Sequence, residues 1–421
     1  MTSRSLRFIL VIFIAGLIGY FIGVTKVNLD WKSYKPTVAV TSKEPPPGTT
    51  SLDMTMFWAV LDQIETKYYD KSVIDPQKIV NGAITGMVES LNDPFTLYLP
   101  PQQNTDFKQG LAGSFEGIGA ELGLENKQIV IAAPPLDGSP ALKAGLHAGD
   151  AIIKVDDQTT FGWTLDQAVT KVRGQKGTSV MLTIVRKSDQ KTQDVKIMRD
   201  TITLKSVASW TKAVKDIVGI DKKNFPAAQD DKVAYIRLSQ FGDNTNQEWV
   251  GIANKIALTH QQDPSLKGVV LDLRNNPGGY LTDAVFIASE FIGSGTIVMQ
   301  EDGTGTQTSL PVSRKGLLTD IPLIVLINKG SASASEIVAG SLRDHNRAEL
   351  IGETSFGKGT VQEAEDLGGG AGLHVTIAKW LTPNGTWVHK KGLTPDISVP
   401  LDPKNPTHDT QLEKAVSELV K

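Results

Sequence analysis

The segment from residue 321 to residue 362 constrains the fold more than any other part of the chain. It begins with an uninterrupted apolar run, residues 321–327, which predicts a strand covered on both faces. The next residues are too small to fill a core and include Ser331, Ser333 and Ser335, and helical spacing resumes at residue 336. The sequence therefore predicts a strand-to-helix turn that exposes a serine nucleophile, where unpaired N–H groups at the helix start can hold an oxyanion.

A serine hydroxyl needs a base to remove its proton, and the sequence offers two candidates. His345 is the nearest histidine, but it lies among charged residues that predict a solvated helix end. Lys358 stands between two glycines, which allow the backbone to pack closely against the turn. Packing would desolvate Lys358 and favour the neutral amine, which can act as a general base. A Gly-Lys-Gly segment is also typical of an exposed turn, so composition alone leaves the base open.

Two stretches of this segment carry a family resemblance. The sequences GSASASEI at residues 330–337 and IGETSFGKGTVQ at residues 351–362 resemble the core of the carboxyl-terminal processing peptidases, which are tail-specific Ser/Lys proteases. The resemblance implies that Ser333, the middle serine of the run, is the nucleophile. It further implies that Lys358 is the base and that Gln362 orients the lysine.

A third stretch extends the resemblance. Residues 270–279, VLDLRNNPGG, predict a strand that ends in a glycine turn. The resemblance implies that the N–H of Gly279 and the N–H of Ala334 form the oxyanion hole.

The sequence gives no sign of a cofactor, a metal or a nucleic-acid partner. Residues 352–359 read G-x-x-x-x-G-K, but Gly359 occupies the position where a nucleotide site needs Ser or Thr to hold magnesium. The chain has 0 cysteines, which excludes cysteine-based metal sites and disulfides. Its 43 basic and 46 acidic residues give a net charge of −3 without a long basic stripe. We therefore predict no cofactor, no metal site and no nucleic-acid binding.

The amino-terminal residues predict a membrane segment. Arg4 and Arg7 precede an uncharged run from Phe8 to Val24, which as a helix would be roughly 26 Å long. Residues 1–26 are therefore a membrane anchor or signal segment, and the basic flank places the body on the extracytoplasmic side, in the periplasm or cell envelope. An uncleaved anchor is favoured because no A-x-A site lies near the end of the run. Residues 27–52 are rich in proline towards their end and predict an extended linker.

Residues 53–102 predict a small helical subdomain. Apolar residues recur at helical spacing from Met54 to Tyr68, and a second helix is expected over residues 76–91. We expect each helix to pack through its own apolar stripe. The resemblance implies that helices at this place take part in self-association, as a homodimer or a larger homo-oligomer.

Residues 103–199 predict a PDZ domain that binds the free carboxyl-terminal tails of protein substrates. Residues 115–122 resemble a carboxylate-binding loop with its following strand, and the amides around Gly117, Ile118, Gly119 and Ala120 could hold a terminal carboxylate. Residues 139–155 resemble the PDZ pattern most strongly, and residues 165–172 predict the helix that forms the other wall of the groove. The resemblance also implies a switching role for Arg173, whose alternative role is a surface salt bridge.

Residues 200–400 alternate between strands and helices, which predicts a layered α/β domain. The chain is therefore expected to be an α+β and α/β multidomain protein, because 421 residues exceed one ordinary core. The resemblance implies a ClpP/crotonase-like protease core with an inserted PDZ domain of β-sandwich type. Residues 401–421 form a carboxyl-terminal tail or helix.

Three functions fit these features. The first is a serine endopeptidase with a Ser/Lys dyad that captures carboxyl-terminal tails in exported or envelope proteins. The second is a catalytically silent PDZ scaffold or chaperone at the membrane. The third is a Ser-His-Asp hydrolase that uses His374 or His389. Nucleophile, base and orienting residue all match the family, which favours the first function.

Overall fold

The computed structural model describes residues 27–32, 35–40, 53–187, 190–402 and 405–421. The predicted membrane segment, residues 1–26, lies outside the described residues. No helix within the described ranges is long and apolar enough to cross a membrane. The chain divides into two compact units, one of Met1–Thr105 with Gln362–Thr376 and one of Asp106–Val361 with Ile377–Lys421.

The described residues of the first unit include a hairpin, the helices α2 and α3 and a short strand pair. Strands β1 (Val27–Lys32) and β2 (Lys35–Val40) pair in antiparallel fashion, within the segment predicted as an extended linker. Helix α2 (Thr55–Lys67) is followed by α3 (Pro76–Glu89), which begins at Pro76 and is capped by the carboxylate of Asp75. Strand β3 (Leu97–Leu99) pairs with the start of the long strand β20 (Ala371–Leu381). Val88, Tyr98 and Ala371 form the small core of this unit.

Helix α2 departs from the sequence prediction. None of its residues is buried, and the side chains of Met56 and Trp58 are 73% and 60% exposed. Phe57 and Leu61 are half-buried, so the described residues cover the apolar stripe of this helix only in part, although the helix itself forms where predicted. The periodic spacing identified the apolar face but could not supply a partner for it.

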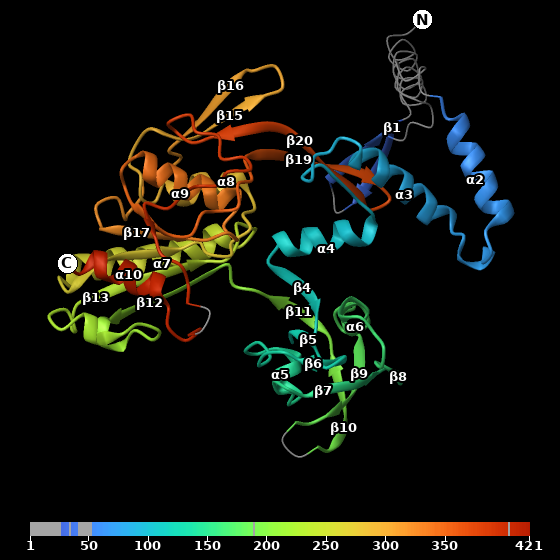
Figure 1. Ribbon diagram of the computed structural model, residues 1–421, viewed down its shortest axis with the longest axis horizontal. Coiled ribbons are helices and arrows are strands. Elements are labelled where there is room, and N and C mark those ends of the chain that lie inside the picture. Colours follow the sequence, from blue (N-terminus) through green and yellow to red (C-terminus); the bar gives the residue numbers. More distant parts are fainter. Residues whose placement is uncertain (1–26, 33–34, 41–52, 188–189, 403–404) are drawn as a thin grey trace, which may run out of the picture. The chain divides into compact units, whose positions relative to one another are not determined.

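The second unit begins with a module of short strands. Its sheet has the order β10-β9-β7-β6-β5 (Figure 1), with β8 paired to β7. Helix α6 (Leu165–Val172) coincides with the predicted groove helix and starts with a capping box between Thr164 and Gln167. The strand bounds are β5 Leu122–Glu125, β6 Gln128–Ile131, β7 Ala151–Val155, β8 Gln158–Thr159, β9 Ser179–Val185 and β10 Thr192–Met198, and the short helix α5 is Pro140–Lys143.

The module joins the rest of the unit through a two-stranded ribbon. Strands β4 (Ser114–Gly117) and β11 (Asp200–Thr203) pair in antiparallel fashion, and helix α4 (Pro101–Leu111) precedes them. At the end of α6, the guanidinium of Arg199 donates hydrogen bonds to the carbonyl groups of Lys171 and Val172, at 3.1 and 2.8 Å. Arg199, which directly precedes β11, therefore caps the carboxyl end of the groove helix.

A layered α/β domain follows, as the sequence predicts. Its main sheet has the order β12-β13-β14-β17-β18-β21, in which only the β12–β13 pair is antiparallel among the described pairings. The strands are β12 Val207–Ala213, β13 Lys232–Leu238, β14 Leu266–Asp272, β17 Leu323–Ile327, β18 Glu349–Gly352 and β21 Ile397–Ser398. The helices are α7 Thr245–Gln262, α8 Leu281–Ala288, α9 Ala334–Asp344 and α10 Thr410–Leu419.

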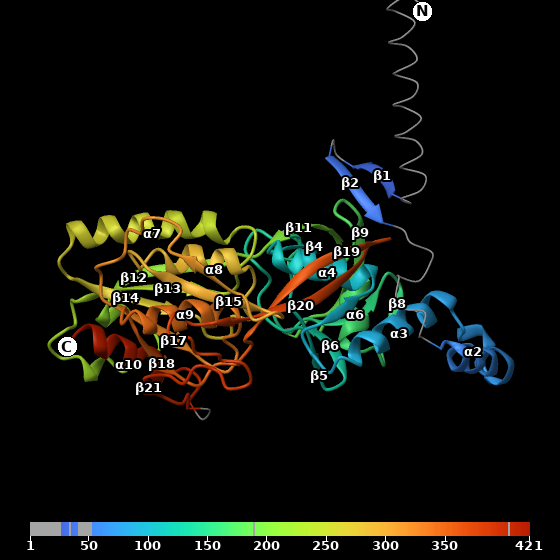
Figure 2. The same ribbon diagram turned by 90° about the horizontal axis from the view of Figure 1, so that it is seen from above.

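Alternate residues of the buried strands face two separate cores. In β17, Val325 packs with residues of α7, α8 and α9, whereas Ile324 packs with residues of α10. Figure 2 shows α7 and α8 on one side of this sheet and α10 on the other. Because both faces are covered, β17 is fully apolar, as expected for a central parallel strand.

A second sheet lies at the edge of this domain. Strands β15 (Thr296–Asp302) and β16 (Gln307–Pro311) form a hairpin, and β15 also pairs with residues 378–381 of β20. Strand β19 (Thr360–Gly368) belongs to the same sheet and begins directly after the predicted catalytic lysine segment.

Candidate active site

The predicted nucleophile turn lies between β17 and α9. Ser333 has φ 55° and ψ −115°, a conformation that residues with a side chain rarely adopt and that costs about 1–3 kcal/mol. Such a sharp turn is typical of nucleophiles placed at a strand-to-helix corner. Helix α9 starts at the next residue, so its positive end points at this position.

The structure distinguishes the three serines of the run. The hydroxyl of Ser331 donates to the carbonyl of Leu273 at 2.8 Å, and that of Ser335 donates to the carbonyl of Asn276 at 2.9 Å. Both serines are fully buried, whereas Ser333 is half-buried. The outer two serines therefore fasten the turn to the segment after β14, and the middle one can reach a substrate.

The glycine pair after β14 lies against this turn. A Cβ atom on Gly278 would lie 2.8 Å from the Cβ of Ser333 and 3.0 Å from the amide nitrogen of Ala334. Phe241 fixes this pair, because its N–H donates to the carbonyl of Gly278 and its carbonyl accepts from the N–H of Tyr280, both at 2.9 Å. Only glycine fits at residue 279, where φ is +140° and a Cβ would lie 1.8 Å from the Phe241 carbonyl oxygen.

The amides assigned to the oxyanion hole are available for a ligand. Neither the N–H of Gly279 nor that of Ala334 donates a hydrogen bond to another of the described residues. The Ala334 amide belongs to the first turn of α9, where N–H groups have no acceptor within the helix. Two such donors beside one serine can stabilise a negative oxygen.

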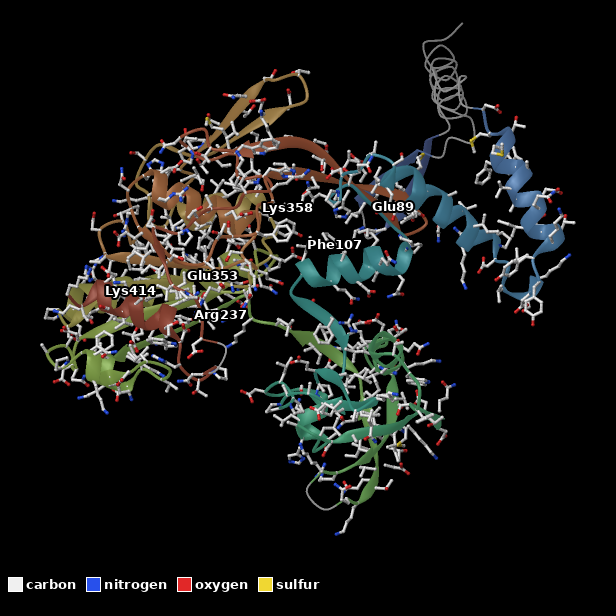
Figure 3. All side chains as sticks on the ribbon, in the orientation of Figure 1. Glu89, Phe107, Arg237, Glu353, Lys358 and Lys414 are labelled. Carbon is white, nitrogen blue, oxygen red and sulfur yellow. The ribbon has the colours of Figure 1, made fainter. Side chains whose placement is uncertain are left out.

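Lys358 lies in a tightly held loop between β18 and β19 and is labelled in Figure 3. The indole of Trp380 donates to the carbonyl of Lys358 at 2.9 Å, and the indole of Trp387 donates to the carbonyl of Gly359 at 2.8 Å. A Cβ on Gly357 or Gly359 would lie within 2.8 Å of neighbouring backbone or indole nitrogens. The Gly-Lys-Gly segment is thus a packed loop and not the exposed turn that its composition suggests.

A buried carboxylate connects this loop with the nucleophile turn, and the sequence analysis did not assign it. Glu336, 0% exposed, accepts hydrogen bonds at Oε2 from the amides of Ser333 and Lys358, both at 2.9 Å. Its Oε1 accepts from the hydroxyl of Ser355 at 2.6 Å and from the amide of Gly357 at 2.7 Å. The signal that could have identified it is the Ser-x-x-Glu spacing from residue 333 to 336, which is typical of a helix start.

Two other polar residues considered for the site have contacts of their own. Gln362 belongs to the first unit, where its side-chain amide donates to the hydroxyl of Thr376 at 3.1 Å. His345 ends α9, about 16 Å along the helix from its start, and its Nε2 lies 2.7 Å from the carbonyl oxygen of Thr296. This distance excludes His345 as the base for Ser333.

Polar groups also surround Tyr280, which directly follows Gly278 and Gly279. Burial and a hydrogen bond to Asp243 raise the pKa of Tyr280 above its ordinary value, so its hydroxyl stays neutral at physiological pH. Burial raises the pKa of Asp283 on α8, although a hydrogen bond from Asn246 opposes this shift. Tyr280 remains 38% exposed and is therefore accessible to a ligand beside Gly279.

The PDZ-like module contains a separate groove of about 470 Å³. Three of the predicted peptide-binding residues, Ile118, Gly119 and Ala120, line it, and Gly117 precedes them at the end of β4. The remaining walls are mainly apolar and come from β5, the segment before α5, helix α6 and the residue after β11: Leu122, Ala133, Pro134, Leu136, Val169, Val172 and Leu204. An apolar groove beside a glycine loop fits an extended peptide end.

Arg173 lies at the rim of this groove. Its guanidinium carbon stands 5.0 Å from the centre of the Phe115 ring, a cation–π contact with strand β4. Among the ion pairs of the described residues, none involves Arg173. In the described part of the chain, Arg173 thus contacts an aromatic ring, and the alternative role in a surface salt bridge is not seen there.

Comparison with known proteins identifies three matching regions. Residues 232–399 match peptidase family S41, residues 109–185 match the PDZ domain, and residues 13–103 match the activating protease CtpB N-terminal domain.

Similar proteins span most of the chain. The carboxy-terminal processing protease CtpB of Bacillus subtilis is 36% identical over 382 residues, which cover 90% of this chain and 74% of that protein. CtpA of the same organism is 37% identical over 341 residues, covering 81% and 67%. A solved S41 protease structure from Bacteroides fragilis is 15% identical with a TM-score of 0.51, covers 92% of this chain and 98% of that chain, and supports the fold alone.

Proposed function

Because this chain belongs to peptidase family S41 and is a serine-type carboxy-terminal processing peptidase, we propose that it cleaves exported or cell-envelope proteins near their free carboxyl-terminal tails. In the proposed reaction the Ser333 hydroxyl attacks the scissile carbonyl carbon while the neutral amine of Lys358 accepts the hydroxyl proton. Gln362 orients the lysine. The amides of Gly279 and Ala334 stabilise the tetrahedral oxyanion.

The second half of the reaction follows from the same groups. When the peptide C–N bond breaks, the ammonium of Lys358 returns its proton to the leaving amine. A water molecule then attacks the acyl-serine ester and gives one proton to Lys358. As the ester C–O bond breaks, Lys358 returns this proton to the Ser333 oxygen, and the new carboxylic acid loses its proton to solvent. The reaction balances without a metal or a cofactor.

The observation that carries this proposal is the conformation of the turn at Ser333. A half-buried serine with φ 55° directly precedes a helix, beside a glycine pair and two amides that have no acceptor among the described residues. Backbone strain of this kind is rarely kept in a protein unless a function requires it. The turn supports a nucleophile, and family membership supports the partners assigned to it.

The groove of the PDZ module supports the assignment of the tail-binding site. A carboxylate held by the loop from Gly117 to Ala120 would place the last side chain of a peptide among apolar residues of the groove. We therefore propose that tails ending in apolar residues bind more tightly than charged tails.

One experiment tests the enzyme and its substrate class together. The full-length protein is incubated with unfolded proteins that differ only in an apolar or a charged tail, and mass spectrometry identifies the fragments. We expect preferential cleavage of the apolar-tailed protein, and loss of cleavage in Ser333→Ala and Lys358→Ala. Cleavage that persists in both variants would refute the dyad.

The same experiment addresses the alternative functions. A catalytically silent scaffold would bind the tails without producing fragments that depend on Ser333. A Ser-His-Asp hydrolase would lose activity in His374→Ala or His389→Ala and keep it in Lys358→Ala. The side chain of His389 stacks on the ring of Trp387 at 5.0 Å, a contact that already explains its position.

The membrane and oligomer assignments complete the proposal. Residues 1–26 carry the apolar run that we propose as the anchor, with the body on the extracytoplasmic side. We propose that the exposed apolar residues of α2, which include Met56 and Trp58, support self-association. Light scattering of the detergent-solubilised chain compares the mass of the unmodified protein with that of Met56→Glu. An unchanged mass would refute a role of α2.

We also propose that Arg173 links tail binding to cleavage. Its guanidinium contacts Phe115 on β4, and Leu204 at the groove wall follows β11 and donates its N–H to the carbonyl of Gly113 at 2.7 Å. Both contacts join the groove to the ribbon that leads into the catalytic domain. Arg173→Ala should lose stimulation by an added tail peptide, and retained stimulation would exclude this role.

A further inference from the structure

The carboxylate of Glu336 receives an unusual share of the hydrogen bonds around the proposed active site. Its four donors are neutral, three amides and one hydroxyl, and they come from both catalytic segments. A buried carboxylate is costly unless donors such as these replace the water that it loses. The donors and the carboxylate therefore fix one another in place.

The segments that this carboxylate joins are separated in sequence but must act together. On one side is the amide of Ser333, whose strained backbone needs an acceptor in a fixed position. On the other side is the amide of Lys358, in a loop that is also held by a bond from the Phe356 amide to the Ser331 carbonyl at 2.9 Å. One oxygen of Glu336, Oε2, accepts from both catalytic residues.

We propose that Glu336 is a positioning residue that sets the distance between the serine nucleophile and the lysine base. This inference rests on the proposed Ser/Lys function. Glu336 does not touch the substrate in this scheme, and it acts through the backbone of the two catalytic residues. Because both amides bind one oxygen atom, loss of that acceptor would release both segments at once.

The test is Glu336→Gln in the full-length protein. Glutamine keeps the size of the side chain but replaces one acceptor oxygen with an N–H₂ group. This group cannot accept a hydrogen bond and would face two of the four donors that now bind Glu336. We expect kcat for a peptide with an apolar tail to fall on the order of 100-fold, the usual consequence of a 1 Å misplacement of catalytic groups. The KM should stay within threefold, because the tail-binding groove is unchanged. The rate of Ser333 labelling by a fluorophosphonate probe should fall in parallel with kcat.

A matched control separates positioning from stability. Glu290 is also a buried glutamate, 1% exposed, and it accepts hydrogen bonds from the indole of Trp249 and the amide of Leu317. It lies beyond the carboxyl end of α8 (Leu281–Ala288) and belongs to neither catalytic segment. Glu290→Gln should lower the melting temperature but keep kcat and the labelling rate, normalised to the folded fraction, within threefold of the unmodified protein.

The outcomes are distinguishable. The inference is overturned if Glu336→Gln keeps kcat and probe labelling within threefold, or if both glutamine variants lose activity only in proportion to unfolded protein. The proposed function itself fails if Ser333→Ala or Lys358→Ala retains cleavage, whatever Glu336→Gln does. If Glu336→Gln does not fold, Ser355→Ala decides the question, because it removes a single donor to Oε1. A reduced kcat at unchanged KM then supports the inference, and an unchanged kcat overturns it.

Discussion

Replacement of Gly279 by alanine should disrupt the proposed oxyanion hole more than it disrupts the fold. The added Cβ would lie 1.8 Å from the Phe241 carbonyl oxygen, a backbone atom that cannot rotate away. Since normal contacts with carbon are about 3.5 Å, the two segments must separate by roughly 1.5 Å. Overpacking and the positive φ together should cost about 2–4 kcal/mol of unfolding free energy. A shift of this size moves the Gly279 amide out of reach of the oxyanion.

The kinetic consequence can be measured directly. Loss of one oxyanion donor typically lowers kcat by about 10²–10³-fold. We expect a decrease of this size for Gly279→Ala with a fluorogenic peptide that has an apolar tail, while the KM stays similar. Gly251→Ala is the matched control, because no atom lies within 4 Å of its added Cβ on helix α7. The control should gain about 0.5–1 kcal/mol of stability and keep its kcat. A folded Gly279→Ala protein with kcat within threefold of the unmodified enzyme would refute the reasoning.

Three other substitutions test separate parts of the structure. Asp409→Ala should cost about 2–4 kcal/mol in urea unfolding at pH 7, because the carboxylate caps α10 and pairs with Arg274 at 2.8 Å. Burial acts to raise the pKa of Asp409, but Arg274 outweighs it and lowers the pKa, so this contribution is present above the unfolded pKa of about 3.9 and lost as pH falls below it. A difference between the two proteins that does not shrink as the pH is lowered from 7 through the acid range would contradict this. Val169→Asp should raise the KM for an apolar-tailed peptide at least tenfold (about 1.4 kcal/mol) at similar kcat, and an unchanged KM would exclude Val169 from the groove. Trp380→Phe removes the indole donor to the Lys358 carbonyl and should lower kcat about tenfold in steady-state assays, whereas unchanged kcat would show that the loop does not need this bond.

Local patterns were sufficient to predict the elements that carry the site. The apolar run of β17 and the periodic spacing of residues 165–172 each depend on near neighbours in the sequence, and the structure contains both elements as predicted. The location of Ser333 at a strand-to-helix turn follows in the same way, because small residues after a buried strand cannot continue either pattern. The spacing of apolar residues therefore predicts a helix or strand wherever the conformation of a segment depends on that segment's own residues.

Contacts between distant segments were not predictable in this way. Glu336 has the spacing of a helix cap, but two of its donors belong to residues 357 and 358, and nothing in the local sequence connects them. Trp380 and Trp387 lie more than 20 residues from Lys358 in the sequence, and the structure shows that their indoles hold the lysine loop. Helix α2 is the opposite case, because its apolar stripe predicts burial that the described residues provide only in part.

The proposed nucleophile has an unfavourable backbone conformation, and the surrounding core explains how this is tolerated. Ser333, Gly279 and Gly357 have φ of 55°, 140° and 89°, and only the two glycines adopt such values without strain. The conformation of Ser333 persists only if its neighbours fix it more firmly than the strain opposes it. Helix α9 meets this need, because every residue from 334 to 342 is buried and the helix cannot shift to relieve the turn. The small residues of the segment therefore have a mechanical role, since they let α9 pack closely enough to hold the strained serine in place.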